Sequence, residues 1–189
     1  FTVTVNLVDP PTAPTLVVSN PFVLVPTDPD TCAVATLPAP SVITTGSPAP
    51  TIGYSPSLTG PYPWGSRTTI TVTASNGVEP NAVAIYTVTV ADRQRPNLVM
   101  PADITVPATG PDGAVVTYAT PTATDNCDTS PEVVALDTRL LSGHTFPIGV
   151  TRVSWLAMDD ATNADVDSFT ITVTPTTPTI RPISPIEGD

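Results

Sequence analysis

The chain has 189 residues, of which 12% are charged, and its formal net charge is −11. All six basic residues are arginines, so the sequence lacks the basic patch that nucleic acid or an anionic membrane surface would need. Twenty-five prolines and abundant threonine and valine, against only ten glycines, disfavour helices and predict an all-β protein.

One five-residue strand pattern occurs three times in the chain. Each copy begins with an aromatic residue and then alternates threonine with a large apolar residue, at Phe1–Val5, Tyr86–Val90 and Phe169–Val173. Alternation with a period of two predicts a strand with one buried and one exposed face. The copies begin 85 and 83 residues apart, which predicts tandem modules that each end in this signature strand.

In chain order, we expect four parts: an orphan strand over 1–10, a first module over 11–92, a second module over 93–178 and a proline-rich tail over 179–189. The strands expected in the first module are Thr15–Ser19, Phe22–Val25, Cys32–Thr36, Thr51–Tyr54, Thr68–Ala74 and Ala84–Val90. Those expected in the second are Asp103–Val106, Ala114–Tyr118, Pro131–Asp137, Val150–Met158 and Asp167–Val173. Short strands separated by turns at this density are typical of an immunoglobulin-like β-sandwich.

The second module carries a set of motifs in a recognisable order: Pro121–Cys127, Ser142-Gly143, Phe146–Gly149, Trp155–Asp159 and Phe169–Val173. In this order they resemble the hyalin repeat (HYR), an extracellular immunoglobulin-like module of adhesive and cell-surface proteins. The first module resembles a degenerate copy, in which the Asp-Asn-Cys motif is absent. The resemblance implies two tandem immunoglobulin-like sandwiches in an extracellular protein.

The two cysteines occupy different positions of the family pattern. The resemblance implies a bridge between a cysteine near the start of a module and the cysteine of Asp-Asn-Cys, but the first module has only Cys32 and the second only Cys127. Gly113 stands where the second module would have its partner cysteine. We therefore expect no bridge within a module, and we expect two buried free thiols, with a Cys32–Cys127 bond as the alternative.

A run of oxygen donors in the second module is a candidate Ca²⁺ site. It comprises Asp159, Asp160, Asn163 and Asp165, since Ca²⁺ takes six to eight oxygen ligands. The spacing is not that of an EF-hand, and solvated acidic loops are common, so the alternative is a loop without a cofactor. Asp125 and Asp128 are expected to cap turns through their side chains.

The inventory of reactive side chains argues against an enzyme. The chain has one histidine, His144, no lysine, no glycine-rich phosphate loop and no cysteine-histidine metal cluster. No Asn-x-Ser/Thr sequon is present, so glycosylation is expected on hydroxyl groups of the Thr/Pro-rich segment, at Thr174, Thr176, Thr177 and Thr179.

The excess of terminal strands over modules suggests a function in assembly. Each of the two modules ends in one signature strand, so the third copy of the strand belongs to neither. This third strand has Phe1, Val3 and Val5 on its apolar face and needs a partner. The tail resembles the opening of another module, because Pro178–Ile183 parallels Pro96–Pro101. We expect an extracellular fibre or stalk in which copies of the chain join head to tail, without a membrane span, nucleic acid or enzymatic activity. The alternative is an adhesion module that binds a glycan or a protein through loops at one end of a sandwich.

Overall fold

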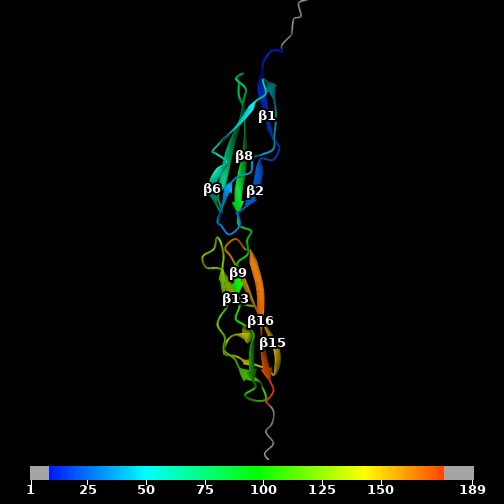
Figure 1. Cartoon of the computed structure of the whole chain (residues 1–189), viewed down its shortest axis with the longest axis vertical. Helices are drawn as coiled ribbons and strands as arrows, with labels where there is room; N and C mark the ends of the chain where they lie inside the picture. Colours follow the sequence, from blue (N-terminus) through cyan, green and yellow to red (C-terminus); the bar gives the residue numbers. More distant parts are fainter. Residues whose placement is uncertain (1–8, 177–189) are drawn as a thin grey trace, which may run out of the picture. The chain divides into compact units, whose positions relative to one another are not determined.

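The computed structural model describes residues 9–176, and the chain divides into two compact units, unit 1 up to Gln94 and unit 2 from Arg95 (Figure 1). The orphan strand, with Phe1, Val3 and Val5, lies outside the described residues, as do Thr177, Thr179 and the rest of the tail. The all-β prediction is confirmed. The described residues contain sixteen strands and a single 3₁₀ turn, η1 (Thr138–Leu140). None of their helical segments is long and apolar enough to cross a membrane.

Unit 1 is built from eight strands in two layers. They are β1 (Thr12–Val18), β2 (Phe22–Pro26), β3 (Ala33–Thr36), β4 (Val42–Ser47), β5 (Thr51–Ser55), β6 (Thr59–Pro63), β7 (Arg67–Ser75) and β8 (Ala82–Ala91). One layer is a four-stranded sheet in the order β2-β8-β7-β5. The other consists of two short antiparallel ladders, β1 with β4 and β3 with β6.

Unit 2 repeats this arrangement strand for strand. Its strands are β9 (Asn97–Val99), β10 (Ile104–Pro107), β11 (Ala114–Val115), β12 (Thr122–Thr124), β13 (Glu132–Ala135), β14 (Thr145–Phe146), β15 (Gly149–Met158) and β16 (Ala164–Thr174). The four-stranded sheet has the order β10-β16-β15-β13, and the short ladders join β9 to β12 and β11 to β14. In each four-stranded sheet, one edge strand is parallel to the last strand of the unit. Strand β2 pairs with β8 in this way, and β10 pairs with β16.

The signature strands lie inside these sheets at the same place in each unit. Tyr86–Val90 belongs to β8 and Phe169–Val173 to β16, each between the parallel edge strand and the long antiparallel neighbour. Their aromatic and aliphatic side chains are almost fully buried, from 0% exposed at Tyr86 to 3% at Phe169. The period-two alternation therefore reports the buried face correctly, because successive side chains of a strand point to opposite faces.

Each unit has its own apolar core between the two layers. In unit 1, Tyr86 and Val88 of the four-stranded sheet pack with Val34 of β3. In unit 2, Phe169 and Trp155 pack with Phe146 of β14. Tyr118 contacts the ring of Phe169 edge-on, with 4.9 Å between ring centroids and an angle of 71°. Trp155 is 5% exposed and belongs to this core.

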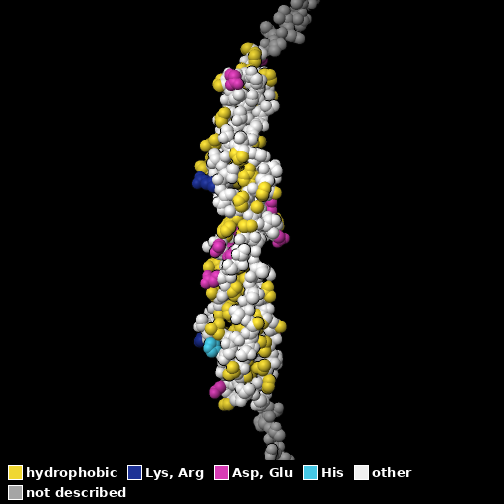
Figure 2. All heavy atoms as spheres, turned by 90° about the vertical axis from the view of Figure 1, so that its left-hand side faces the viewer, with side chains coloured by type: hydrophobic (Ala, Val, Ile, Leu, Met, Phe, Trp, Pro, Cys, Tyr) yellow, Lys and Arg dark blue, Asp and Glu magenta, His cyan; other side chains and the backbone are white. Residues whose placement is uncertain are grey.

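Five strands were not expected from the sequence: β4, β6, β9, β12 and β14. Strand β6 contains Gly60, Pro61 and Pro63, which favour a turn, but it pairs with β3 on one side only, and proline is tolerated where a strand has no second neighbour. The others have two to six residues, too few for an alternating pattern to be distinct. The charged side chains are few and scattered on the face shown in Figure 2, in keeping with the low charge density.

Candidate functional site

The acidic loops of unit 2 lie where the two long strands of its sheet are joined. Asp159 follows β15 directly and begins the turn into β16. In β15 the core-facing positions are Val153, Trp155 and Ala157, so Asp159 continues the buried face of the strand and is itself 5% exposed. A carboxylate in such a place must be satisfied by hydrogen bonds.

Asn163 satisfies this carboxylate from the far side of the turn. Its backbone N–H donates to Asp159 Oδ1 at 2.7 Å, and its Nδ2 donates to Asp159 Oδ2 at 2.8 Å. Backbone bonds from Asp159 N to Asn163 O and from Thr162 N to Asp159 O close the loop at 3.1 and 3.0 Å. They hold Thr162 at a φ of 69°, a left-handed conformation that residues other than glycine seldom adopt.

Asp125 and Asp128 order the neighbouring loop between β12 and β13. Asp125 Oδ1 accepts from the backbone N–H groups of Cys127 and Asp128, at 2.8 and 2.9 Å. Asp128 Oδ1 accepts from Ser130 N at 2.8 Å, and its Oδ2 accepts from Asp160 N at 3.1 Å. Both aspartates thus cap turns, as the sequence suggested. Asp128 also fastens this loop to the β15–β16 turn.

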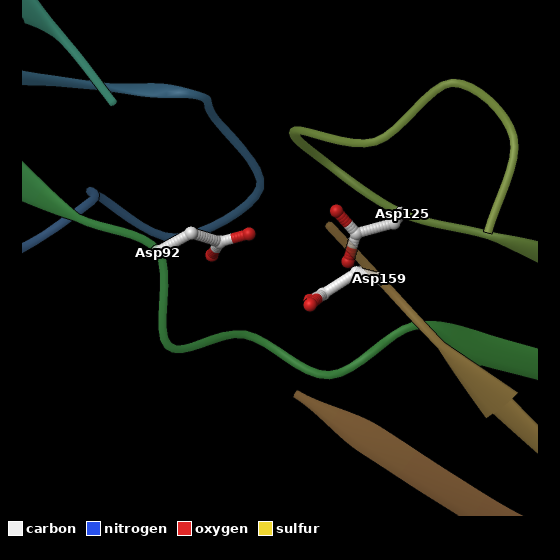
Figure 3. Close-up of side chains that lie close together, drawn as sticks. All are labelled: Asp92, Asp125 and Asp159. Carbon is white, nitrogen blue, oxygen red and sulfur yellow. The ribbon is translucent and has the colours of Figure 1, made fainter. Parts of the chain in front are cut away.

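The two loops bring one pair of carboxylates together. Oxygen atoms of Asp125 and Asp159 lie within 4.8 Å of one another, and Figure 3 shows the two side chains next to each other. The second carboxylate oxygen of Asp125, Oδ2, is shielded from solvent and accepts no hydrogen bond among the described residues.

The predicted calcium donors do not come together as a set. Asp159 and Asn163 are in contact, but both oxygens of the Asp159 carboxylate already accept hydrogen bonds from Asn163. Asp160 is exposed, and Asp165 lies within β16, paired with Ala157. Among the described residues, no grouping of three acidic, histidine or cysteine ligand atoms includes Asp160 or Asp165. The residues present therefore fit hydrogen-bonded loop caps better than the four-residue cation site.

The expectation of two free thiols is wrong. Neither cysteine is free, and both Cys32 and Cys127 are disulfide-bonded. In the structure Cys32 directly precedes β3, whereas Cys127 lies between β12 and β13, so they occupy different places in their units, in agreement with their different positions in the family pattern. Each unit contains one cysteine, so neither has a bridge of its own, as predicted.

Gly113 occupies the position in unit 2 that Cys32 occupies in unit 1, immediately before the strand that pairs with β14 or β6. Its φ is 115°, and a Cβ atom there would lie 1.8 Å from the carbonyl oxygen of Phe146. No side chain fits at that distance, so unit 2 in this conformation has no room for a cysteine at residue 113.

The remaining predicted residues are placed as follows. Thr174 ends β16 and is exposed, and its hydroxyl donates to Val106 O at 3.3 Å. Thr176 is also exposed. His144 lies exposed in the loop before β14.

Comparison with known proteins supports the resemblance for the second unit. Residues 91–173 match the family model described as the HYR domain. A comparison with curated proteins gives no significant match. Among solved structures, human protocadherin-24 EC1-2 is 16% identical, with 88% of this chain and 100% of that chain covered and a TM-score of 0.35. The fibronectin(III)-like modules of Clostridium thermocellum CbhA are 15% identical, with 85% and 94% covered and a TM-score of 0.32. Scores this low carry no argument about function.

Proposed function

Because residues 91–173 match the family model of the HYR domain, we propose that this chain is a non-enzymatic extracellular structural protein built from two such modules. In this proposal, copies of the chain join head to tail into a fibre or surface stalk by exchanging a strand. Sugars on threonine hydroxyls coat the surface.

The observation that carries the proposal is the place of the signature strand. In each unit it forms the last strand of the sandwich and buries an aromatic residue and two aliphatic residues, as Tyr86, Val88 and Val90 do in unit 1. Both places are filled by strands of the chain itself, β8 and β16. The third copy of the pattern, Phe1–Val5, therefore has no equivalent place in either unit. An alternating strand without a partner would expose its apolar face and its backbone groups.

The strand order within each unit supports a joint between copies. In both units the second strand pairs in parallel with the signature strand, Phe22 of β2 with Thr87 in unit 1 and Ile104 of β10 with Ile171 in unit 2. The tail resembles a module opening, since Pro178–Ile183 parallels Pro96–Pro101, the segment that contains β9 and precedes β10. In the proposed joint, the tail of one copy and Phe1–Val5 of the next belong to one sandwich. Such a contact does not close on itself, so repetition produces a filament.

Burial of the apolar face of the added strand is the main stabilising contribution in the proposed joint. Burial of the apolar side chains of Phe1, Val3 and Val5 contributes roughly 5 kcal/mol or more of transfer free energy, in addition to the backbone hydrogen bonds of the added strand. Heterologous strand addition also places the threonines of the pattern on the outer face, as in β8 and β16.

Electron microscopy of a truncated chain tests the proposal. Full-length protein should form filaments, and a chain without residues 1–9 should remain monomeric with both sandwiches folded. A matched variant, in which Phe1, Val3 and Val5 are replaced by threonine, keeps the strand propensity but removes the apolar face, and it should also stay monomeric. Filaments from the truncated chain with the same appearance as those from the full-length chain would refute the strand-exchange mechanism.

A further inference from the structure

A groove on the outer face of unit 1 has the composition of a ligand site. It crosses three neighbouring strands of the four-stranded sheet and has a volume of about 210 Å³, so it is a shallow groove smaller than most small-molecule pockets, which measure roughly 300–1,000 Å³. Strand β2 supplies one wall, β8 the floor and β7 the opposite wall. The lining residues are Phe22, Val23, Leu24, Arg67, Thr87 and Thr89.

The groove is apolar on one side and polar on the other. Phe22 and Leu24 project from the edge strand β2 and are 67% and 52% exposed. Beside them Thr87 and Thr89 form the floor, because Phe22 pairs with Thr87 and Leu24 with Thr89. Thr87 is buried and its hydroxyl lies 3.3 Å from that of Thr69, so Thr89 offers the more accessible hydroxyl. Arg67 pairs with Thr89 from the other side, so its guanidinium lies across the floor from the apolar wall.

The sandwich itself does not require this composition, as the equivalent face of unit 2 shows. Aligning β8 with β16 places Thr170 and Thr172 at the floor positions. There the wall positions of Phe22 and Leu24 are taken by Asp103, whose carboxylate accepts from Thr170 N at 2.7 Å, and by Thr105. Val150 stands at the position of Arg67. The two sheets have the same strand order with different outer faces, so the apolar wall and the arginine of unit 1 are additions to the fold.

Arg67 is a cation without an ion pair among the described residues, where the single salt bridge joins Arg139 to Asp137. An exposed guanidinium of this kind can donate charge-assisted hydrogen bonds to an anionic ligand. Its planar donors match a carboxylate in particular.

We propose that this groove binds an anionic saccharide, with the carboxylate of a uronic acid on Arg67. A pyranose ring has an apolar face of C–H groups that stacks on the Phe22 ring and contacts Leu24, while one of its hydroxyl groups exchanges a hydrogen bond with Thr89. A peptide strand added along the edge of β2 would contact the backbone of β2 and leave Arg67 and the hydroxyl floor unused. This binding activity goes beyond the proposed assembly and does not depend on it.

The test is a titration of the full-length chain, followed by NMR of backbone amides, with trigalacturonic acid as the probe. Trigalacturonic acid at millimolar concentration should shift amide signals of β2, β7 and β8, and neutral maltotriose should bind at least tenfold more weakly. Arg67→Gln should lower the affinity for trigalacturonic acid at least tenfold, and Leu24→Thr, which copies Thr105 of unit 2, should lower it as well. Because these side chains are exposed, the variants should unfold at the temperature of the original protein.

Arg152→Gln is the matched control, since it removes the same charge from unit 2, where Arg152 bonds to Ser168. It should leave the affinity unchanged. The proposal is overturned if trigalacturonic acid causes no shifts, if maltotriose binds equally well, or if Arg152→Gln weakens binding as much as Arg67→Gln. It is also overturned if a peptide of residues 1–8 shifts the same amide signals and displaces the saccharide, because the groove is then a protein-binding site.

Discussion

Replacement of Gly113 by alanine should destabilise unit 2 far more than the same replacement at Gly143. Both glycines have a positive φ, 115° and 88°, so alanine at either residue costs about 1–3 kcal/mol for the unfavourable backbone conformation. At Gly143 a new Cβ atom would have no neighbour within 4 Å. At Gly113 it would lie 1.8 Å from Phe146 O and 3.0 Å from Pro147 Cα.

The additional contact at Gly113 cannot be relieved by a side-chain rotation, because the atoms in the way belong to the backbone. Strand β11 pairs with β14 through Ala114 and Phe146, and Phe146 is fully buried in the core. Moving this backbone breaks the ladder and shifts the Phe146 ring. We expect a total loss of about 4 kcal/mol or more at Gly113, against 1–3 kcal/mol at Gly143.

Urea unfolding followed by tryptophan fluorescence measures this difference. Trp155 reports on unit 2 when Trp64 is replaced by phenylalanine. A domain of this size has a free energy of unfolding of about 5–14 kcal/mol, so Gly113→Ala should lose a large part of it and Gly143→Ala a small part. Gly113→Cys should behave like Gly113→Ala and form no bridge within unit 2. Equal losses for the two alanine variants would refute the reasoning from the Phe146 carbonyl.

Two further outcomes can be measured on the same protein. Hydrogen bonds from the Arg139 side chain lower the pKa of Asp137 to about 2. Because the pKa is lowered in the folded protein, this pair stabilises the fold at a pH above the ordinary pKa of 3.8, and the stabilisation is lost as the pH falls toward 2. An NMR titration of side-chain carboxyl groups should show a higher pKa for Asp137 in Arg139→Gln, which removes the guanidinium but keeps the backbone bond from residue 139, and an unchanged pKa would exclude the guanidinium as its cause. Intact mass spectrometry of the protein from its source should give a mass above the 19.5 kDa of the sequence, with sugars at Thr174 or Thr176, and a mass equal to that of the sequence would exclude glycosylation.

The sequence determined the fold class, the core faces of the long strands and the turn-capping roles of Asp125 and Asp128. Alternation of threonine with apolar residues identified the buried positions of β8 and β16, because the side-chain period of a strand is fixed by its backbone. The same local rule failed for short strands such as β6, where Pro61 and Pro63 favour a turn and only pairing with β3 makes a strand.

The tertiary structure decided which side chains from distant segments meet. Asp159 and Asn163 are close in the chain, and their contact was within reach of sequence reasoning, but the approach of Asp125 to Asp159 depends on how the loop after β12 is held against the β15–β16 turn. The saccharide groove depends on the register of three strands. In β2 the run Phe22–Val25 is apolar at every position, a pattern typical of a strand buried on both faces. Only the position of β2 at the edge of the sheet, with one face toward solvent, leaves Phe22 and Leu24 exposed across the floor from Arg67.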